Sequence, residues 1–157
     1  MASQRRGWRA YRIADRRHTI FDGQGAAAFG GRWNSPGRRV IYAAESYAGA
    51  MLEVLANANI GRIPKHHSWI EIVIAEGVSV ETVDVRKVRR WDSPDQRATR
   101  MFGDKWYDEK RSTVLIVPST VTRVERNLVI NQEHPDFRKL RVTRPKPVIW
   151  DARLFDR

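Results

Sequence analysis

The chain has 157 residues, 41% of them hydrophobic and 30% charged; this length and composition predict one soluble domain that spans residues 1–157 and buries its own core. Cysteine is absent, which excludes a disulfide framework and zinc–thiolate sites and suits a reducing compartment, so we expect a cytoplasmic protein. The formal charge of +11 favours anionic partners, although the basic residues are scattered in pairs and form no nucleic-acid-binding motif.

The first half of the chain predicts two strands and a helix. "WRAYRI" (Trp8–Ile13) is strand-like, and the glycine-rich "FDGQGAAAFGG" that follows predicts a loop. "RRVIYAA" predicts a short strand that ends near Tyr42. "SYAGAMLEVLANA" has apolar residues at helical spacing, so it predicts a helix with Ser46 as its N-cap.

The middle of the chain predicts two more strands and a second helix. "SWIEIVIA" (Ser68–Ala75) alternates between apolar and polar residues and predicts a strand, with "VSVETVDV" as another strand beside or near it. "DSPDQRATRMFGDKWYDEK" predicts a helix. In this helix Ser93 is the expected N-cap, Pro94 the first helical residue and Gln96 the partner in a capping box.

The last third is strand-rich. "TVLIVP" and "NLVIN" predict two apolar strands separated by a polar turn, and "KPVIWDA" predicts a last one. Strands outnumber helices and do not alternate regularly with them, so we expect an α+β fold with mainly antiparallel sheets and a few helices. No segment approaches the roughly 20 apolar residues of a membrane span, and we expect no membrane partner.

Several classes of site are not indicated by the sequence. The four histidines, at positions 18, 66, 67 and 134, do not have the spacing of a metal-binding motif. The adjacent pair His66 and His67 is expected in a loop. There is no P-loop, no GxSxG and no dinucleotide-binding glycine motif. We therefore expect no metal site.

A few individual residues suit the binding of a phosphorylated ligand. Arg12 ends a predicted strand and Arg32 follows two glycines; two converging guanidinium groups suit a diphosphate. Tyr42 offers a ring for stacking, Glu53 lies at the edge of the apolar helix face, and Ser112 begins a strand. Each residue type has an ordinary alternative: a surface arginine, a core tyrosine, a solvated glutamate or a turn serine.

Taken together, however, the residues resemble a known family, the RES domain. The resemblance is carried, in order and spacing, by "YRI" (11–13), "GGRWNSPG" (30–37), "VIYAAES" (40–46), "AMLEVL" (50–55), "KRSTVLIVPS" (110–119) and "NLVINQEHPDF" (127–137). It covers nearly the whole chain.

The resemblance implies a function. RES proteins are toxins of bacterial toxin–antitoxin pairs, and their fold is similar to that of ADP-ribosyltransferase toxins. They consume NAD by cleaving the nicotinamide–ribose bond, with water or phosphate as acceptor, and at least one branch modifies a protein instead. Their usual partner is an Xre-type helix-turn-helix antitoxin that plugs the NAD cleft. The resemblance thus implies NAD as substrate, no metal, and no direct nucleic-acid binding without the antitoxin.

The resemblance also assigns roles to residues. Arg12 and Arg32 would bind the phosphates or ribose of NAD, and Tyr42 would pack against the nicotinamide end. Glu53 would favour the positive charge that develops as the glycosidic bond breaks, as carboxylates do in glycoside hydrolysis. Ser112 would hydrogen-bond nicotinamide or the ribose. Glu53, Arg32 and Tyr42 form the expected catalytic set.

Two positions depart from the family's pattern, and one residue has no assigned role. Gln132 stands where relatives commonly have proline after the asparagine, Asn131, which belongs to the downstream motif without a definite role. Ala43 and Ala44 follow the tyrosine where many relatives carry a nearby serine.

Three functions remain open from the sequence. The first is a toxin that degrades NAD by hydrolysis or phosphorolysis, and the second is a mono-ADP-ribosyltransferase acting on a protein. A basic nucleic-acid-binding module is the third, and it predicts salt-sensitive binding without release of nicotinamide.

Overall fold

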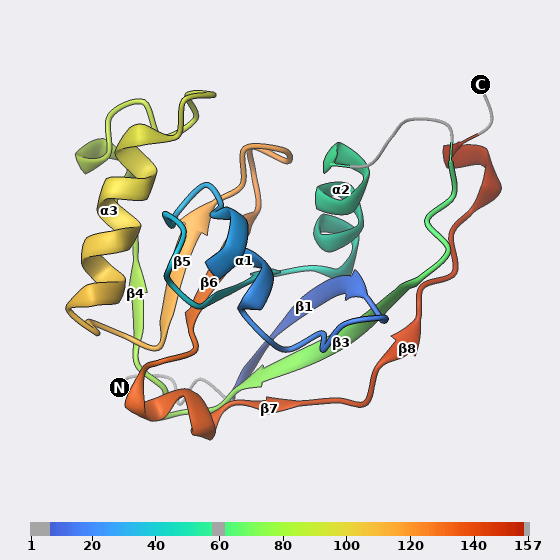
Figure 1. The fold of residues 1–157 in the computed structure, drawn as a ribbon, viewed down its shortest axis with the longest axis horizontal. Coiled ribbons are helices and arrows are strands. Elements are labelled where there is room, and N and C mark those ends of the chain that lie inside the picture. Colours follow the sequence, from blue (N-terminus) through green and yellow to red (C-terminus); the bar gives the residue numbers. More distant parts are fainter. Residues whose placement is uncertain (1–6, 58–61, 156–157) are drawn as a thin grey trace, which may run out of the picture.

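The computed structural model describes residues 7–57 and 62–155. It confirms the predicted α+β class: strands form one twisted sheet, and helices lie against it (Figure 1). In the described part of the chain the strands follow the order β4-β5-β6-β2-β1-β3-β7, and β8 also pairs with β3. The strands are β1 (Trp8–Asp15), β2 (Val40–Ala44), β3 (His67–Ile74), β4 (Val80–Thr82), β5 (Val114–Pro118), β6 (Arg126–Asn131), β7 (Arg141–Val142) and β8 (Lys146–Pro147).

Each strand predicted from the sequence is present, with two differences in detail. The stretch "VSVETVDV" contributes β4, but this strand pairs in parallel with β5, far across the sheet from β3. All other strand pairs are antiparallel. Of "KPVIWDA", only its first two residues form a strand, β8, on the edge of β3.

The described residues contain three α-helices, α1 (Gln24–Phe29), α2 (Tyr47–Asn57) and α3 (Arg97–Asp108), and short 3₁₀ turns cover 85–87, 135–139 and 152–154. The prediction of a loop over 21–31 is wrong in part. Three consecutive alanines in this segment favour a helix, and they lie in α1. Gly30, with φ of 73°, ends this helix in a conformation that favours glycine. The predicted helix from Ser46 is confirmed as α2 up to Asn57; its last predicted residue lies outside the described residues.

The predicted capping box at the start of α3 is wrong. The helix begins at Arg97, and Gln96 precedes it in the left-handed region without a side-chain cap. The backbone N–H of Arg97 is instead satisfied by Asp95 Oδ1 at 3.0 Å. Ser93 lies in a preceding turn, where its N–H donates to the carbonyl of Arg90. A carboxylate at the helix start thus replaces the expected serine.

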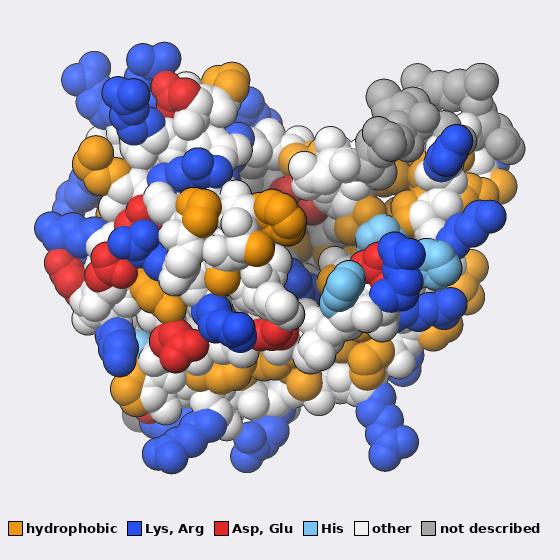
Figure 2. Space-filling model, in the orientation of Figure 1, with side chains coloured by type: hydrophobic (Ala, Val, Ile, Leu, Met, Phe, Trp, Pro, Cys, Tyr) orange, Lys and Arg blue, Asp and Glu red, His pale blue; other side chains and the backbone are white. Residues whose placement is uncertain are grey.

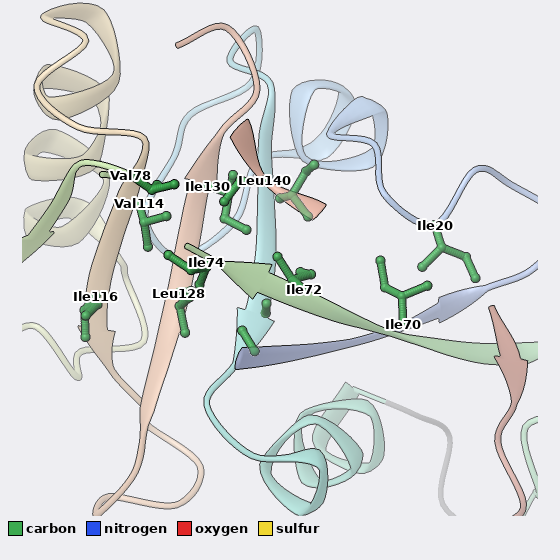
Figure 3. Packing of buried hydrophobic residues seen from close by; sticks show 13 residues of the cluster. Ile20, Ile70, Ile72, Ile74, Val78, Val114, Ile116, Leu128, Ile130 and Leu140 are labelled. Atoms are coloured by element: carbon green, nitrogen blue, oxygen red, sulfur yellow. The ribbon is translucent and has the colours of Figure 1, made fainter. Parts of the chain in front are cut away.

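Two clusters of buried side chains hold the sheet on its opposite faces. On one face, Ile70, Ile72 and Ile74 of β3 pack with residues of β5, β6 and β2, as Figure 3 shows for Leu128 and Ile130. The strict alternation of buried and half-buried residues along β3 matches the period of a strand that is covered on one face.

The second cluster lies between the sheet and α3 and is centred on two tryptophans, Trp33 and Trp106, which are 2% and 0% exposed. Helix α3 approaches closely because it has Gly103 at the contact. A Cβ at this position would overlap the carbonyl oxygen of Trp33. Within residues 7–57 and 62–155, no helix combines the length and apolar character needed to cross a membrane.

Candidate active site

A cleft of about 1240 Å³ opens between α1 and α2, where the surface is hollowed (Figure 2). The cleft follows from the strand pairing. All of β1 pairs with β3, and all of β2 pairs with β6, but β1 and β2 share only the pair Tyr11↔Ala44. The sheet therefore splits beyond Tyr11, and the split leaves backbone groups and side chains of both strands open to a ligand.

Arg12 bridges the split in the sheet. Its Nη1 donates to the carbonyl of Tyr42 on β2 at 2.8 Å, and its Nε donates to the carbonyl of Ile20 at 2.7 Å. Burial lowers the pKa of Arg12 to about 10, so the guanidinium remains charged at neutral pH. Arg12 therefore brings a partly buried positive charge to the cleft and replaces part of the missing strand ladder.

Tyr42 is fixed by the glycine-rich segment that precedes it. Gly31 and Asn34 pair backbone to backbone around a tight turn, and Tyr42 Oη accepts from Trp33 N–H at 3.0 Å and donates to Asn34 Oδ1 at 2.6 Å. The ring lies against Gly31, where a Cβ would come within 2.6 Å of Oη. Burial raises the pKa of Tyr42, so its hydroxyl stays protonated and only its ring is available to a ligand.

Arg32 lies on the tight turn and lines the cleft. Its Nη1 donates to the carbonyls of Trp91 and Ser93, at 3.2 and 3.0 Å. The loop that holds it is tied in turn to the β5–β6 connection, where Arg123 Nη1 bonds Asp92 Oδ2 at 2.8 Å and the guanidinium of Arg123 lies 5.7 Å from the Trp91 ring centre. This pairing lowers the pKa of Asp92. The side chain of Arg32 is thus held by the loop that contains Trp91 and Ser93.

Glu53 comes from the opposite wall, on α2. The helix begins at Tyr47, whose ring packs against Trp69 with centroids 5.1 Å apart, and Ser46 Oγ accepts from Gly49 N–H at 2.9 Å, which confirms Ser46 as N-cap. One carboxylate oxygen of Glu53, Oε1, accepts hydrogen bonds from two further side chains.

The two donors to Glu53 are Ser119 Oγ, at 3.1 Å, and Asn127 Nδ2, at 2.8 Å. Ser119 is 1% exposed and follows β5; Asn127 lies on β6 and lines the cleft. Because both anchor Oε1, they fix the carboxylate while its second oxygen is left for a ligand. The sequence did not single out either residue.

Of the five predicted site residues, the structure brings four to the cleft: Arg12, Arg32, Tyr42 and Glu53. Ser112 is not among the described residues that line it. Its buried hydroxyl accepts from Trp106 Nε1 and donates to the carbonyl of Val114, each at 2.8 Å, so the expected contact with nicotinamide or ribose is corrected to a structural bond.

A serine that contacts Glu53 occurs in the same stretch, because "KRSTVLIVPS" contains two serines. Ser119 follows β5 at the end that meets Glu53, whereas Ser112 precedes its start. Asn131, without an assigned role, is also fully buried and structural: its Oδ1 accepts from Glu133 N–H at 2.9 Å. This bond shapes the turn that leads to His134.

The cleft also includes side chains that the sequence did not indicate. His67, expected in a loop, begins β3 and lines the cleft, and its buried Nδ1 has no hydrogen-bond partner among the described residues. Burial lowers the pKa of His67, which favours the neutral ring. Phe29 and Gln96 line the cleft from the side of Arg32. Among residues 7–57 and 62–155, no cluster of three or more metal-ligating side chains occurs.

Comparison with known proteins agrees with this geometry. The model of the RES domain family matches residues 8–151, and the chain therefore belongs to the RES family. It is 35% identical over 136 residues to the "Prs ADP-ribosylating toxin" of Sphingobium sp. (strain YBL2), with 84% of each chain covered. It is 33% identical to "Toxin Res" of Yersinia enterocolitica over 92% of this chain and 97% of that one.

The fold is also found among solved structures. A chain of the M. tuberculosis MbcT–MbcA toxin–antitoxin complex superposes with a TM-score of 0.74 at 20% identity, covering 89% of this chain and 83% of that one. At this identity the likeness concerns the fold alone.

Proposed function

We propose that this protein is a toxin that binds NAD in the cleft and cleaves its nicotinamide–ribose bond. One observation carries the proposal: Arg12, Arg32, Tyr42 and Glu53, which come from four different segments of the chain, line a single cleft. Two guanidinium groups match the two negative charges of the NAD diphosphate, because arginine presents a fixed fork of donors to phosphate oxygens.

The two arginines are already held by protein carbonyls, which fixes them for binding. Arg12 uses Nε and Nη1 for its bonds, and Arg32 uses Nη1. Remaining N–H groups of both side chains can therefore bind phosphate without loss of these contacts. Prior fixation lowers the ordering cost of binding, since the side chains lose little further freedom.

Glu53 would act on the ribose. Nicotinamide is a cationic leaving group, so its departure needs no general acid, but positive charge builds up on the ribose as the C1′–N bond breaks. A carboxylate held at that position stabilises this charge. Ser119 and Asn127 anchor Oε1, and Oε2 then faces the ribose. The bonding electron pair leaves with the pyridine nitrogen.

The acceptor completes the reaction. In hydrolysis, water adds to C1′ and releases one proton, which yields ADP-ribose; in phosphorolysis, inorganic phosphate adds in its place. We favour these small acceptors for this chain. A protein acceptor is the second candidate, because a relative at 35% identity is named for ADP-ribosylation of Prs.

We also propose an Xre-type antitoxin as partner. Other RES proteins that match this chain are named toxins, and the structural neighbour comes from a toxin–antitoxin complex. The formal charge of +11 favours an acidic docking surface on that partner. An interaction of this kind should weaken as salt is raised; undiminished affinity at high salt would argue against charge as its basis.

The decisive experiment is incubation of the purified chain with NAD, with and without phosphate and a cell extract, followed by identification of the products. We expect release of nicotinamide, and the other product identifies the acceptor. Glu53→Gln should lose most of this activity and keep its fold. Glu45→Gln is the matched control, because Glu45 pairs with Arg126 on the surface. Equal turnover by the two variants would contradict the role of Glu53, and tight nucleic-acid binding without nicotinamide release would contradict the proposed reaction.

A further inference from the structure

Two residues at the Arg32 side of the cleft have unusual features that the proposed reaction does not explain. Phe29, at the end of α1, lines the cleft and is 84% exposed. Gln96 also lines it and has a φ of 58°, in the left-handed region. A large exposed aromatic ring and a strained non-glycine residue are each unfavourable in isolation, and such features occur preferentially where a ligand binds.

The ring of Phe29 has room for a planar partner beside it. Phe29 is the last residue of α1, one helical turn after Gly25, and its side chain is exposed. A Cβ at Gly25 would meet no heavy atom within 4 Å. The cleft wall at Gly25 is therefore open, and the exposed ring of Phe29 one turn further along can stack on a planar base.

The side chain of Gln96 is not used to cap α3, and the backbone of Gln96 is held close to that of Arg32. Its side chain makes no capping bond to α3, although it occupies the N-cap position. Thr99 Oγ1 donates to the carbonyls of both Arg32 and Gln96. This shared hydroxyl ties the two backbones together. An amide carries a donor and an acceptor side by side, and this pair matches the edge of adenine.

The position of these residues relative to Glu53 gives the direction of the ligand. Helices α1 and α2 stand on opposite sides of the hollow (Figures 1 and 2). Phe29 belongs to α1 and Glu53 to α2. If the bond to be cleaved lies at Glu53 and the diphosphate at the arginines, the other end of the dinucleotide extends toward α1.

We propose that Phe29 and Gln96 form an adenine subsite that makes the enzyme prefer a dinucleotide over a nicotinamide mononucleotide. This inference rests on the proposed function and deepens it. Phe29 stacks on the adenine ring, and Gln96 hydrogen-bonds its 6-amino edge. Both residues bind the part of NAD that takes no part in bond cleavage, so they act on substrate selection.

The test compares cleavage of NAD with that of nicotinamide mononucleotide, which has the same scissile bond and lacks adenosine. Stacking of a base on an aromatic side chain is typically worth a change of about 5- to 150-fold. Phe29→Ala should therefore lower kcat/KM for NAD by about tenfold or more, mainly through KM, and leave that for the mononucleotide unchanged. Phe29→Tyr should restore the preference. Ile149→Ala is the control, because Ile149 is 88% exposed outside the cleft.

A second arm tests Gln96 with nicotinamide hypoxanthine dinucleotide, in which an oxygen replaces the 6-amino group. Gln96→Ala should reduce the discrimination between this compound and NAD. The subsite is overturned if the parent has the same kcat/KM for NAD and for the mononucleotide. It is also overturned if Phe29→Ala lowers kcat/KM equally for both substrates.

Binding of AMP separates failure of the subsite from failure of the reaction, because it needs no turnover. We expect calorimetry to detect AMP binding to the parent chain and a loss of at least about fivefold in affinity for Phe29→Ala. If the parent cleaves no NAD but binds AMP through Phe29, the proposed reaction fails and the subsite stands. If AMP does not bind, or binds equally well to the variant, the subsite is refuted.

Discussion

Gly31 is the position at which a single methyl group should disturb both the fold and the site. A Cβ there would lie 2.6 Å from Tyr42 Oη and 2.8 Å from ring carbons Cε2 and Cζ. The ring cannot move aside freely, because its hydroxyl is bonded to Trp33 N–H and Asn34 Oδ1. The turn is fixed as well, since Gly31 and Asn34 pair through their backbones.

The magnitude follows from these contacts. Overpacking in a well-packed region costs about 1–3 kcal/mol, and each displaced hydrogen bond of Tyr42 contributes about 1 kcal/mol. We expect Gly31→Ala to lower the free energy of unfolding by about 2–4 kcal/mol. For a chain of this size, a loss of 1 kcal/mol lowers Tm by about 2–4 °C, so Tm should fall by about 10 °C.

Thermal unfolding followed by circular dichroism measures the change, and Gly25→Ala provides a matched control. Gly25 is also in the glycine-rich segment, but a Cβ there has open space and the residue lies in α1. Alanine should stabilise that helix position by about 0.5–1 kcal/mol. If Gly31→Ala has the parental Tm, or if the Tm of Gly25→Ala falls as much as that of Gly31→Ala, the packing of Tyr42 against Gly31 is not what fixes the site.

Three further variants separate binding, catalysis and stability. Arg32→Ala should raise KM for NAD more than it lowers kcat, because a phosphate contact acts in the ground and transition states alike; an unchanged KM in steady-state assays would contradict this role. Ser119→Ala removes a hydrogen bond to Glu53 of about 1 kcal/mol or more, so kcat per folded molecule should fall by about fivefold or more. It also removes the acceptor of Thr122 N–H, so Tm should fall as well, and an unaltered kcat would show that Asn127 alone holds the carboxylate. Ser112→Ala leaves Trp106 Nε1 buried without its acceptor, which costs about 1–3 kcal/mol; denaturant unfolding should show this loss, while kcat per folded molecule stays at the parental value.

Patterns local in the sequence predicted the fold class and most strands well. Alternation along β3 and the apolar run of β5 report directly which faces are buried, and Ser46 lies at the N-terminus of α2 where a cap is needed. These features depend on neighbouring residues. The start of α3 was mispredicted because Ser93 and Asp95 both suit a cap, and only the surrounding turn decides between them.

The site was predictable to the extent that the resemblance fixed positions by spacing. It indicated Arg32, Tyr42 and Glu53 without any knowledge of how the chain brings them together. The error at Ser112 has a physical cause: Ser112 and Ser119 flank the same strand, and their environments differ only through distant partners, Trp106 for one and Glu53 for the other. Composition and periodicity contain no information on such contacts.

The cleft itself depends on a feature that no local pattern reveals, the loss of pairing between β1 and β2 after one residue pair. Arg12 compensates for this loss by bonding the carbonyl of Tyr42 with part of its guanidinium. A continuous ladder at this point would satisfy that carbonyl and close the cleft. The same arginine stabilises the open sheet and, in the proposed complex, would also bind the phosphates of the ligand. Replacement of Arg12 should therefore not separate stability from binding, whereas replacement of Arg32, held by a surface loop, should.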